Sequence, residues 1–324
     1  MYPADVSQDR PLDVFMAHMD VVFSDETELP LRVEDGRIYC PGVGDDTACL
    51  VCLLLAGKYI ARHVDSPSWR EIRGEDAPGL LLVCNAGEEG LGNLKGVRKI
   101  CEDYGGRIKS FCTFDSSLSS IVDRAVGSKR FRVKVRTRGG HSYNDFGNDN
   151  AIAGLASLVG KLYKIQVPEG GKTTYNVGMI SGGTSVNTIA QEAGMLYEFR
   201  SDKRENLEYM ERQFMEVLDR AKAEGMDVSF QVIGVRPCEG QVDPAQKQAL
   251  TDWAHRVVEE MTGQPPKHHA GSTDCNIPLS LGIPSVCVGS FRGAGAHTRE
   301  EYVETDSLEE GYKVAFGMIF GRRD

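Results

Sequence analysis

Short apolar runs alternate with helical patterns in the first third of the chain. Strands are expected at Leu12–Ala17, Gly79–Asn85 and Ser110–Phe114, and helices at Thr47–Arg62 and Asn93–Tyr104. Strands this apolar are buried on both faces, and the helices between them supply the cover. The pattern therefore predicts an α/β fold built on a mostly parallel sheet.

The pattern changes near Asp123. Residues 129–138 (KRFRVKVRTR) alternate charged and apolar positions, as does a strand with one face in water. Further strands are expected at Thr173–Ile180, Gly194–Arg200 and Asp227–Val235, with helices at Asn150–Lys164 and Lys203–Glu224. The resulting order, βαββαβ, is that of a ferredoxin-like unit.

The α/β pattern resumes after this unit, with a helix at Pro244–Met261, a strand at Pro284–Gly289 and a last helix at Asp306–Phe320. We therefore expect two domains. Residues 1–122 and 237–324 form the larger one, and residues 123–236 are inserted into it. The adjacent pair His268–His269 lacks the usual spacing of metal ligands and is expected to lie in a loop.

Composition and charge exclude several classes of protein. Hydrophobic residues make up 41% of the 324 residues, which is enough for a packed core and excludes disorder. The net charge of −10 argues against nucleic-acid binding, and no apolar stretch approaches the roughly 18 residues of a membrane span. Nine cysteines, several in apolar runs, are expected to be reduced thiols in a cytoplasmic protein.

Acidic and imidazole side chains follow the predicted strands of the larger domain or lie in its glycine-containing loops. They are His18, Asp20, Asp45, Asp46, Glu88, Glu89, Asp115 and His297. Because ligands collect at the carboxyl ends of strands in open α/β sheets, we expect these groups to converge. Considered alone, Asp45 and Asp46 are also consistent with the N-cap of a helix. Considered alone, Glu88 and Glu89 are also consistent with a solvated turn.

Together these groups match a site for two cations. Adjacent carboxylates repel unless a cation offsets them, and imidazole with carboxylate suits zinc, with manganese and cobalt as alternatives. Asp45 is expected to bridge the two ions. The expected ligand sets are His18, Asp45 and Asp115 for one ion, and Asp45, Glu89 and His297 for the other.

Two further groups complete this arrangement. Glu88 is left beside the attacking water without a metal bond, which is the position that a general base needs. Asp20 lies two residues after His18, so the two side chains point the same way on an extended segment. Asp20 is then expected to accept the second ring N–H of His18.

Several short motifs occur in one order between residues 16 and 303. They are MAHMDVVF, GRIYCPGVGDDTA, NAGEEGLGN, FDSS, GGHS, GGTSVN, FRSD and GAHTREEYV. This set is similar to that of the co-catalytic zinc family of peptidase T, carboxypeptidase G, succinyl-diaminopimelate desuccinylase, acetylornithine deacetylase and aminoacylase. The stretch GEEGLGNLKG favours the peptidase T-like branch. In relatives, several dozen residues precede the histidine that corresponds to His18, whereas 17 residues precede it in this sequence. The two alternatives are a shortened branch of the family and a sequence that lacks its natural start.

The resemblance implies a phosphorylase/hydrolase-like zinc exopeptidase domain with an inserted lid and dimerisation domain. It implies two zinc ions per chain on the ligands above, with Glu88 as general base and later proton donor, and Asp20 orienting His18. The Asp45–Asp46 peptide bond is often cis in relatives.

The resemblance also assigns residues of the inserted domain. His141 resembles the lid histidine that reaches the substrate carbonyl, often in the site of the partner subunit. Asn187 and Arg200 resemble lid residues that hold the substrate, and Arg suits a bidentate grip on a carboxylate. A homodimer that forms through this domain is therefore implied.

These observations predict a metal-dependent hydrolase that cleaves an amide bond of a short peptide or an N-acyl amino acid, as an amino- or carboxypeptidase or a deacylase. Water activated by two zinc ions would attack, with Glu88 as base. Asp115, where some relatives have Glu, favours amino-acid or peptide substrates. The alternatives are a deacetylase or desuccinylase of a small metabolite, and a non-catalytic dimeric binding protein of the same fold.

Overall fold

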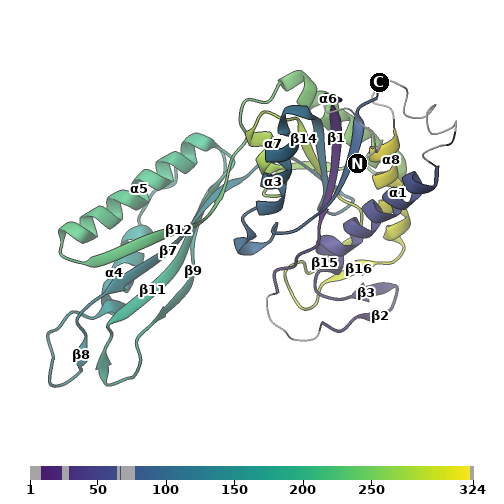
Figure 1. Ribbon diagram of the computed structural model, residues 1–324. Helices are drawn as coiled ribbons and strands as arrows, with labels where there is room; N and C mark the ends of the chain where they lie inside the picture. Colours follow the sequence, from purple (N-terminus) through teal and green to yellow (C-terminus); the bar gives the residue numbers. More distant parts are fainter. Residues whose placement is uncertain (1–8, 24–28, 64–65, 67–76, 322–324) are drawn as a thin grey trace. The chain divides into compact units, whose positions relative to one another are not determined.

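The computed structural model describes residues 9–23, 29–63, 66 and 77–321 (Figure 1). The chain divides into two compact units, Met1–Ala125 with Glu239–Asp324, and Val126–Cys238. We refer to these as the larger unit and the inserted unit. The expected boundaries, after residues 122 and 236, precede the observed ones by three and two residues.

A six-stranded sheet forms the centre of the larger unit, in the order β13-β6-β14-β5-β1-β4. Strands β4, β1, β5 and β14 are parallel to one another, β6 runs antiparallel to β14, and β13 pairs with β6 in parallel. The expected α/β fold is confirmed, with a mixed sheet. The strand bounds are Leu12–His18 (β1), Gly79–Asn85 (β4), Ile108–Phe114 (β5), Ser120–Ala125 (β6), Lys267–Gly271 (β13) and Ser285–Val288 (β14).

Helices cover both faces of this sheet, and β1 shows why. All its residues are buried, and because strand side chains alternate, they enter two separate cores. Phe15 and Ala17 pack in the core formed with α1, α6 and α8, whereas Val14 and Met16 pack in the core formed with α3 and α7 (Figure 1). The helix bounds are Cys49–His63 (α1), Lys95–Tyr104 (α3), Pro244–Thr262 (α6), Asn276–Ser280 (α7) and Ser307–Phe320 (α8).

A second, small sheet in this unit was not predicted. Its order is β15-β16-β3-β2, with bounds Gly293–Ala294 (β15), Tyr302–Glu304 (β16), Arg37–Tyr39 (β3) and Arg32–Glu34 (β2). Tyr302 pairs with Tyr39, so the segment before the Gly42–Asp46 loop lies against the segment that follows His297. The expectation of a loop at His268–His269 was wrong, because both residues lie in β13, which pairs with β6.

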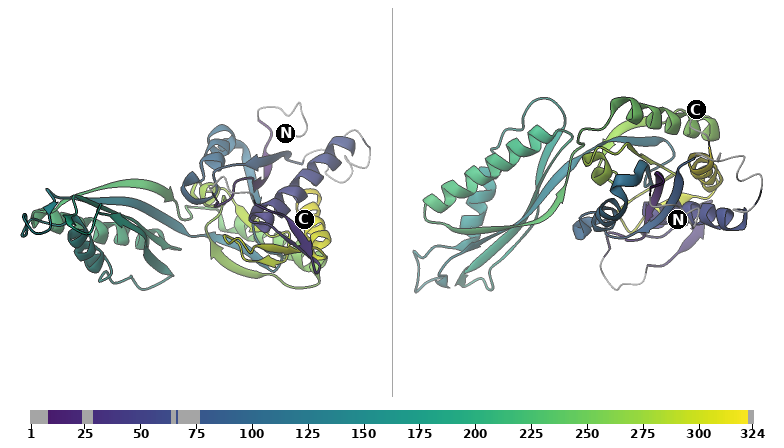
Figure 2. Two further views of the ribbon diagram at one scale, coloured as in Figure 1. Left: turned by 90° about the horizontal axis from the view of Figure 1, so that it is seen from below. Right: turned by 45° about the horizontal axis from the view of Figure 1, so that its top comes forward.

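The inserted unit has the predicted βαββαβ order. Its antiparallel sheet has the order β12-β7-β11-β9, and both helices pack on one face (Figures 1 and 2). The bounds are Gly127–Arg136 (β7), Ala151–Leu162 (α4), Thr173–Gly182 (β9), Glu192–Ser201 (β11), Arg204–Ala223 (α5) and Asp227–Arg236 (β12), with a short pair at Gly140–His141 (β8) and Thr188–Ile189 (β10). Alternate residues of β11 are buried, as expected for a sheet with one covered face.

Two further observations concern the whole chain. Over the residues that the structure describes, no helix combines the length and the apolar character needed to cross a bilayer. All nine cysteines lie within the described ranges and carry free thiols. The expectation that they form no disulfide framework is confirmed.

Candidate metal centre

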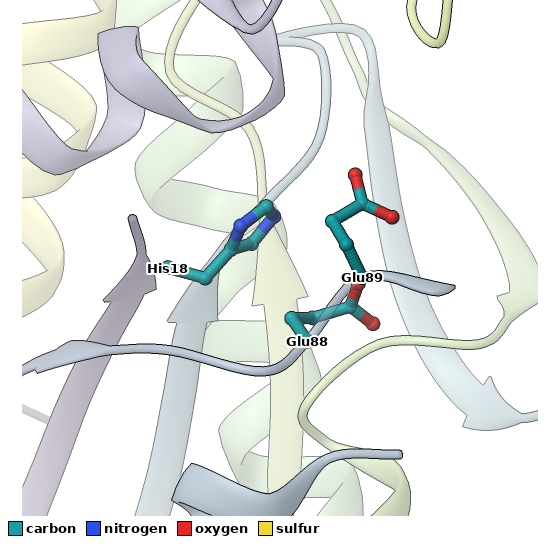
Figure 3. A group of neighbouring side chains, drawn as sticks. All are labelled: His18, Glu88 and Glu89. Atoms are coloured by element: carbon teal, nitrogen blue, oxygen red, sulfur yellow. The ribbon is translucent and has the colours of Figure 1, made fainter. Parts of the chain in front are cut away.

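The candidate ligands come together at one edge of the large sheet. His18 is the last residue of β1, Asp115 directly follows β5, and Glu88 and Glu89 follow β4. Because these three strands are parallel neighbours, their carboxyl ends meet at the same edge. Figure 3 shows His18, Glu88 and Glu89 leaving the end of β1 and the loop after β4 side by side.

Asp45 lies between two imidazoles that come from opposite ends of the sequence. Its Oδ1 is 3.0 Å from Nε2 of His18, and its Oδ2 is 3.1 Å from Nε2 of His297. One carboxylate therefore presents one oxygen to each of two ligand sets. This is the geometry that a bridging carboxylate needs.

The other members of both sets lie within reach. Oδ1 of Asp115 is 3.8 Å from Nε2 of His18, and Oε1 of Glu89 is 3.3 Å from Nε2 of His297. The donor atoms of Asp45, Glu89 and His297 lie within 4.8 Å of one another. All five residues that were expected as ligands are thus contiguous.

Two more acids join this cluster. The donor atoms of Glu88 lie within 4.8 Å of those of His18 and Glu89, and those of Asp46 within 4.8 Å of those of His18 and Asp115. Asp46 is buried, and its Oδ2 accepts the main-chain N–H of His18 at 2.9 Å. Asp46 therefore ties the loop of the bridging carboxylate to the end of β1.

Asp20 acts on this site differently from the sequence-based expectation. Nδ1 of His18 is 2.9 Å from the main-chain oxygen of Asp20 and 3.7 Å from its carboxylate. The carboxylate instead accepts the main-chain N–H groups of Gly87, Glu88 and Glu89, at 2.8, 3.3 and 2.9 Å. The side chain of Asp20 thus fixes the loop of the two glutamates, and its backbone faces the histidine ring.

The loop of Asp45 is held by Glu301, which the sequence analysis did not identify. The buried carboxylate of Glu301 accepts the N–H groups of Gly42, Gly44 and Asp45, at 2.6, 2.9 and 2.8 Å. Gly42 has a φ of 77°, which favours glycine, and the peptide bond between Asp45 and Asp46 is cis. In the sequence, Glu301 is only an acidic residue four positions after His297, and nothing in that spacing indicates that its side chain is buried.

The carboxylates of the cluster repel one another. Burial, and then the Asp115 carboxylate, raise the pKa of Asp46 well above its usual range, and burial and Asp45 raise the pKa of Glu89. Burial alone would lower the pKa of His18, but the Asp115 and Asp45 carboxylates raise it overall. A cation bound among these groups would relieve the repulsion between their carboxylates.

A buried oxygen also points to a cation. Within the described part of the chain, Oε1 of Glu89 has no hydrogen-bond partner, although it is shielded from solvent. Buried polar atoms are rarely left in this state. The donor set of imidazoles and carboxylates, without a thiolate, fits zinc and similar divalent ions.

The three expected lid residues all belong to the inserted unit. Residues of β8 and β10 pair, and the N–H of Ser142 donates to the oxygen of Asn187 at 3.0 Å, so His141 and Asn187 lie in adjacent segments. Arg200 lies toward the other end of β11, eight residues beyond Glu192 and roughly 26 Å along the strand. There its guanidinium donates to both carboxylate oxygens of Glu198, at 2.9 and 3.2 Å.

Comparison with known proteins places this geometry in context. The sequence profile of peptidase family M20/M25/M40 matches residues 14–320. The succinyl-diaminopimelate desuccinylase of Nitrosomonas eutropha is 24% identical over 323 residues, covering 93% of this chain and 80% of its own. The acetylornithine deacetylase of Myxococcus xanthus is 24% identical over 290 residues, covering 86% of this chain and 71% of its own.

Solved structures share the fold. The aminopeptidase PepT from Bacillus cereus superimposes with a TM-score of 0.68 at 22% sequence identity, over 97% of this chain and 81% of its own. The common fold comprises the α/β sheet domain and the separate antiparallel insert.

Proposed function

The chain belongs to peptidase family M20/M25/M40 and is a metal-dependent hydrolase of that family, and from this premise we propose that it cleaves an amide bond in a short peptide or an N-acyl amino acid. The observation that carries the proposal is the position of Asp45, with one oxygen toward His18 and the other toward His297. In a hydrolase with two metal ions, a carboxylate shared by two ligand sets can bridge the ions.

We propose that two divalent ions bind to these sets. His18, Asp45 and Asp115 would hold one ion, and Asp45, Glu89 and His297 the other, with zinc as the expected metal and cobalt or manganese as alternatives. When bound, such ions supply Lewis acidity and lower the pKa of water.

Glu88 is the general base in this proposal. Its side chain is buried beside His18 and Glu89. The two proposed ligand sets do not include Glu88, so its carboxylate is available to accept a proton. Glu88 takes a proton from the water that adds to the amide carbonyl and then protonates the leaving amine nitrogen. Asp20 supports this role, because it holds the main-chain N–H of Glu88 and of both flanking residues.

His141, Asn187 and Arg200 are proposed to act on the substrate. His141 donates to the carbonyl oxygen as negative charge develops there, and Asn187 and Arg200 hold other polar groups of the substrate. Arg200 lies at the end of the inserted sheet where the chain enters at β7, and His141 and Asn187 lie toward the opposite end. This separation supports the proposal that His141 and Asn187 contact substrate in the site of a second copy of the chain, whereas Arg200 contacts it elsewhere.

We propose that the second copy binds through the inserted unit. Strand β9 is one of the two outer strands of its sheet, and Met179 and Ile180 on it are 64% and 59% exposed. An outer strand with exposed apolar side chains is a template for pairing with another chain. The free cysteines further support a reducing compartment, the cytoplasm.

A panel of dipeptides, tripeptides, N-acetyl and N-succinyl amino acids, assayed with zinc, cobalt or manganese, tests the function. We expect metal-dependent release of a free amine from the peptides. The similarity to desuccinylase and deacetylase favours a second candidate, a deacylase of a small metabolite, which selective turnover of the acylated substrates would support. Metal-loaded protein that cleaves none of them would contradict both.

A further inference from the structure

We propose that His255 and His268 form a second binding site for a divalent transition-metal ion such as zinc, outside the cluster around Asp45. His255 lies on α6 and His268 on β13. Nδ1 of His255 is 2.8 Å from Nε2 of His268, and the two ring planes differ by 13°. Strand β13 is four strands away from β1, or about 19 Å across the sheet, so the pair is distinct from the site at His18.

Each imidazole is backed by a carboxylate on its other nitrogen. Oδ2 of Asp123 is 2.9 Å from Nδ1 of His268, and Oε2 of Glu259 is 3.8 Å from Nε2 of His255. Metal-bound histidines almost always have such a partner, which fixes the tautomer and strengthens the ligand. Asp123 therefore gives His268 such a partner, and the carboxylate of Glu259 lies just beyond hydrogen-bond distance of His255.

Hydrogen-bond chemistry determines how the protons lie along this row. An ionised carboxylate only accepts, so Nδ1 of His268 carries the hydrogen that Asp123 receives. In the neutral ring, Nε2 of His268 is then an acceptor, and an N–H of His255 completes the 2.8 Å contact. If the hydrogen of His255 moves from Nδ1 to Nε2, which faces Glu259, the lone pairs of His255 Nδ1 and His268 Nε2 face one another. The number of protons on the two rings does not change.

A zinc ion can enter between these lone pairs only if the two rings turn and separate. With Zn–N bonds of about 2.0–2.1 Å and tetrahedral angles, two ligand nitrogens lie about 3.3 Å apart. The nitrogens must therefore separate by at least roughly half an ångström from their present 2.8 Å, and the nearly parallel rings must turn so that both lone pairs point at one ion. The side chains of His255 and His268 are 34% and 31% exposed, which leaves room for this movement.

The surroundings give water access to the pair. His268 and Asp123 line a cavity of about 560 Å³. Asp252 lines the same cavity, but its carboxylate accepts a hydrogen bond from Gln248 at 2.8 Å, so the two imidazoles are the protein ligands and water fills the remaining positions. The basic residues of the same cavity are paired: Arg124 with Asp123 at 3.3 Å, and Lys247 with Glu239 at 2.6 Å.

Metal titration of the full-length, chelator-treated protein tests the proposal. Calorimetry with zinc chloride gives the number of bound equivalents for the wild type and for His255→Gln and His268→Gln. We expect each variant to bind one equivalent less than the wild type. Asp123→Asn should retain this equivalent with about 10- to 100-fold lower affinity.

His269→Gln is the matched control, because His269 follows His268 in the same strand and faces the other side. It should bind as many equivalents as the wild type. The wild-type protein gives an independent readout in nitrogen-15 spectra of its imidazoles, where saturating zinc should shift the signals of His255 and His268 together and leave that of His269 in place.

Equal zinc stoichiometry in the wild type and His268→Gln would overturn the proposal. Unchanged His255 and His268 signals at saturating zinc would do the same, even if the variants failed to fold. His297→Gln separates this site from the proposed catalytic one: it should lose an equivalent from the cluster and keep the response of His255 and His268.

Discussion

The carboxylate of Glu301 accepts the main-chain N–H of Asp45 at 2.8 Å, across 256 positions of sequence. The same carboxylate holds Gly42 and Gly44, so it fixes the loop that presents Asp45 to the two histidines. Because the loop positions Asp45, its hydrogen bonds to Glu301 help to set the affinity of the site for metal ions.

We expect Glu301→Gln to lower metal affinity about 10- to 100-fold, because an amide NH₂ would face main-chain N–H groups that need an acceptor. Equilibrium dialysis of the variant against zinc measures this. Glu300→Gln is the control, since that neighbouring side chain is 82% exposed. Equal affinity in both variants would remove Glu301 from the positioning of the site.

Replacement of Glu88 by Gln should separate metal binding from chemistry. The substitution keeps the shape of the side chain and removes its ability to take a proton. Turnover should therefore fall about 10²- to 10⁴-fold, with full metal content. Glu89→Gln should lose metal as well as activity. Normal turnover by Glu88→Gln, measured on the best substrate of the panel, would contradict its role as base.

The stability of metal-free protein should fall as the pH rises. Burial and Asp45 raise the pKa of Glu89 above 4.5, and the Asp115 and Asp45 carboxylates raise that of His18 above 6.5, against burial. Both groups bind protons more tightly in the folded state. Their stabilisation is complete below the unfolded pKa values and is lost as the pH passes through the folded ones.

Thermal melts in chelator, recorded from pH 4.5 upward, check this dependence. Metal-loaded protein should have a flatter profile and a higher Tm at alkaline pH, because the ions replace the protons. A chelated protein that gains stability over this range would show that the cluster does not carry the repulsion inferred for it.

Mixed dimers test whether His141 serves the second copy. His141→Ala and Glu88→Gln should each be nearly inactive alone. If His141 acts across the dimer, a mixed dimer contains one site with both wild-type residues, and dissociation and reassociation of the mixture should restore part of the turnover. Remixed Glu88→Gln alone is the control. A mixture as inactive as its components would place His141 in its own chain's site or outside catalysis.

Much of this architecture could be predicted from hydrophobic pattern alone. Strand β4 has the predicted bounds, Gly79–Asn85, because its apolar run is bounded by a glycine and a polar turn. The helix expected from Thr47 begins instead at Cys49, since residues 43–48 form a separate irregular helical turn that carries Asp45.

Other features depend on pairing between distant segments. Strands β3 and β16 have three residues each, too few to show a period, and they are stabilised by each other across about 260 residues of chain. Burial of Glu301 follows from that pairing, so its role had no local signal. His18, Glu89 and Asp115, by contrast, lie at or shortly after the ends of recognisable strands, where parallel topology brings them together.

The inserted unit begins and ends at one place. Ser128 near the start of β7 is paired with Arg236 at the end of β12, so both connections to the rest of the chain emerge side by side. A module attached in this way can be exchanged between genes as a single cassette without cutting a strand of the six-stranded sheet. Recombination can then replace the whole unit, while the strands that carry His18, Glu89 and Asp115 are inherited unchanged.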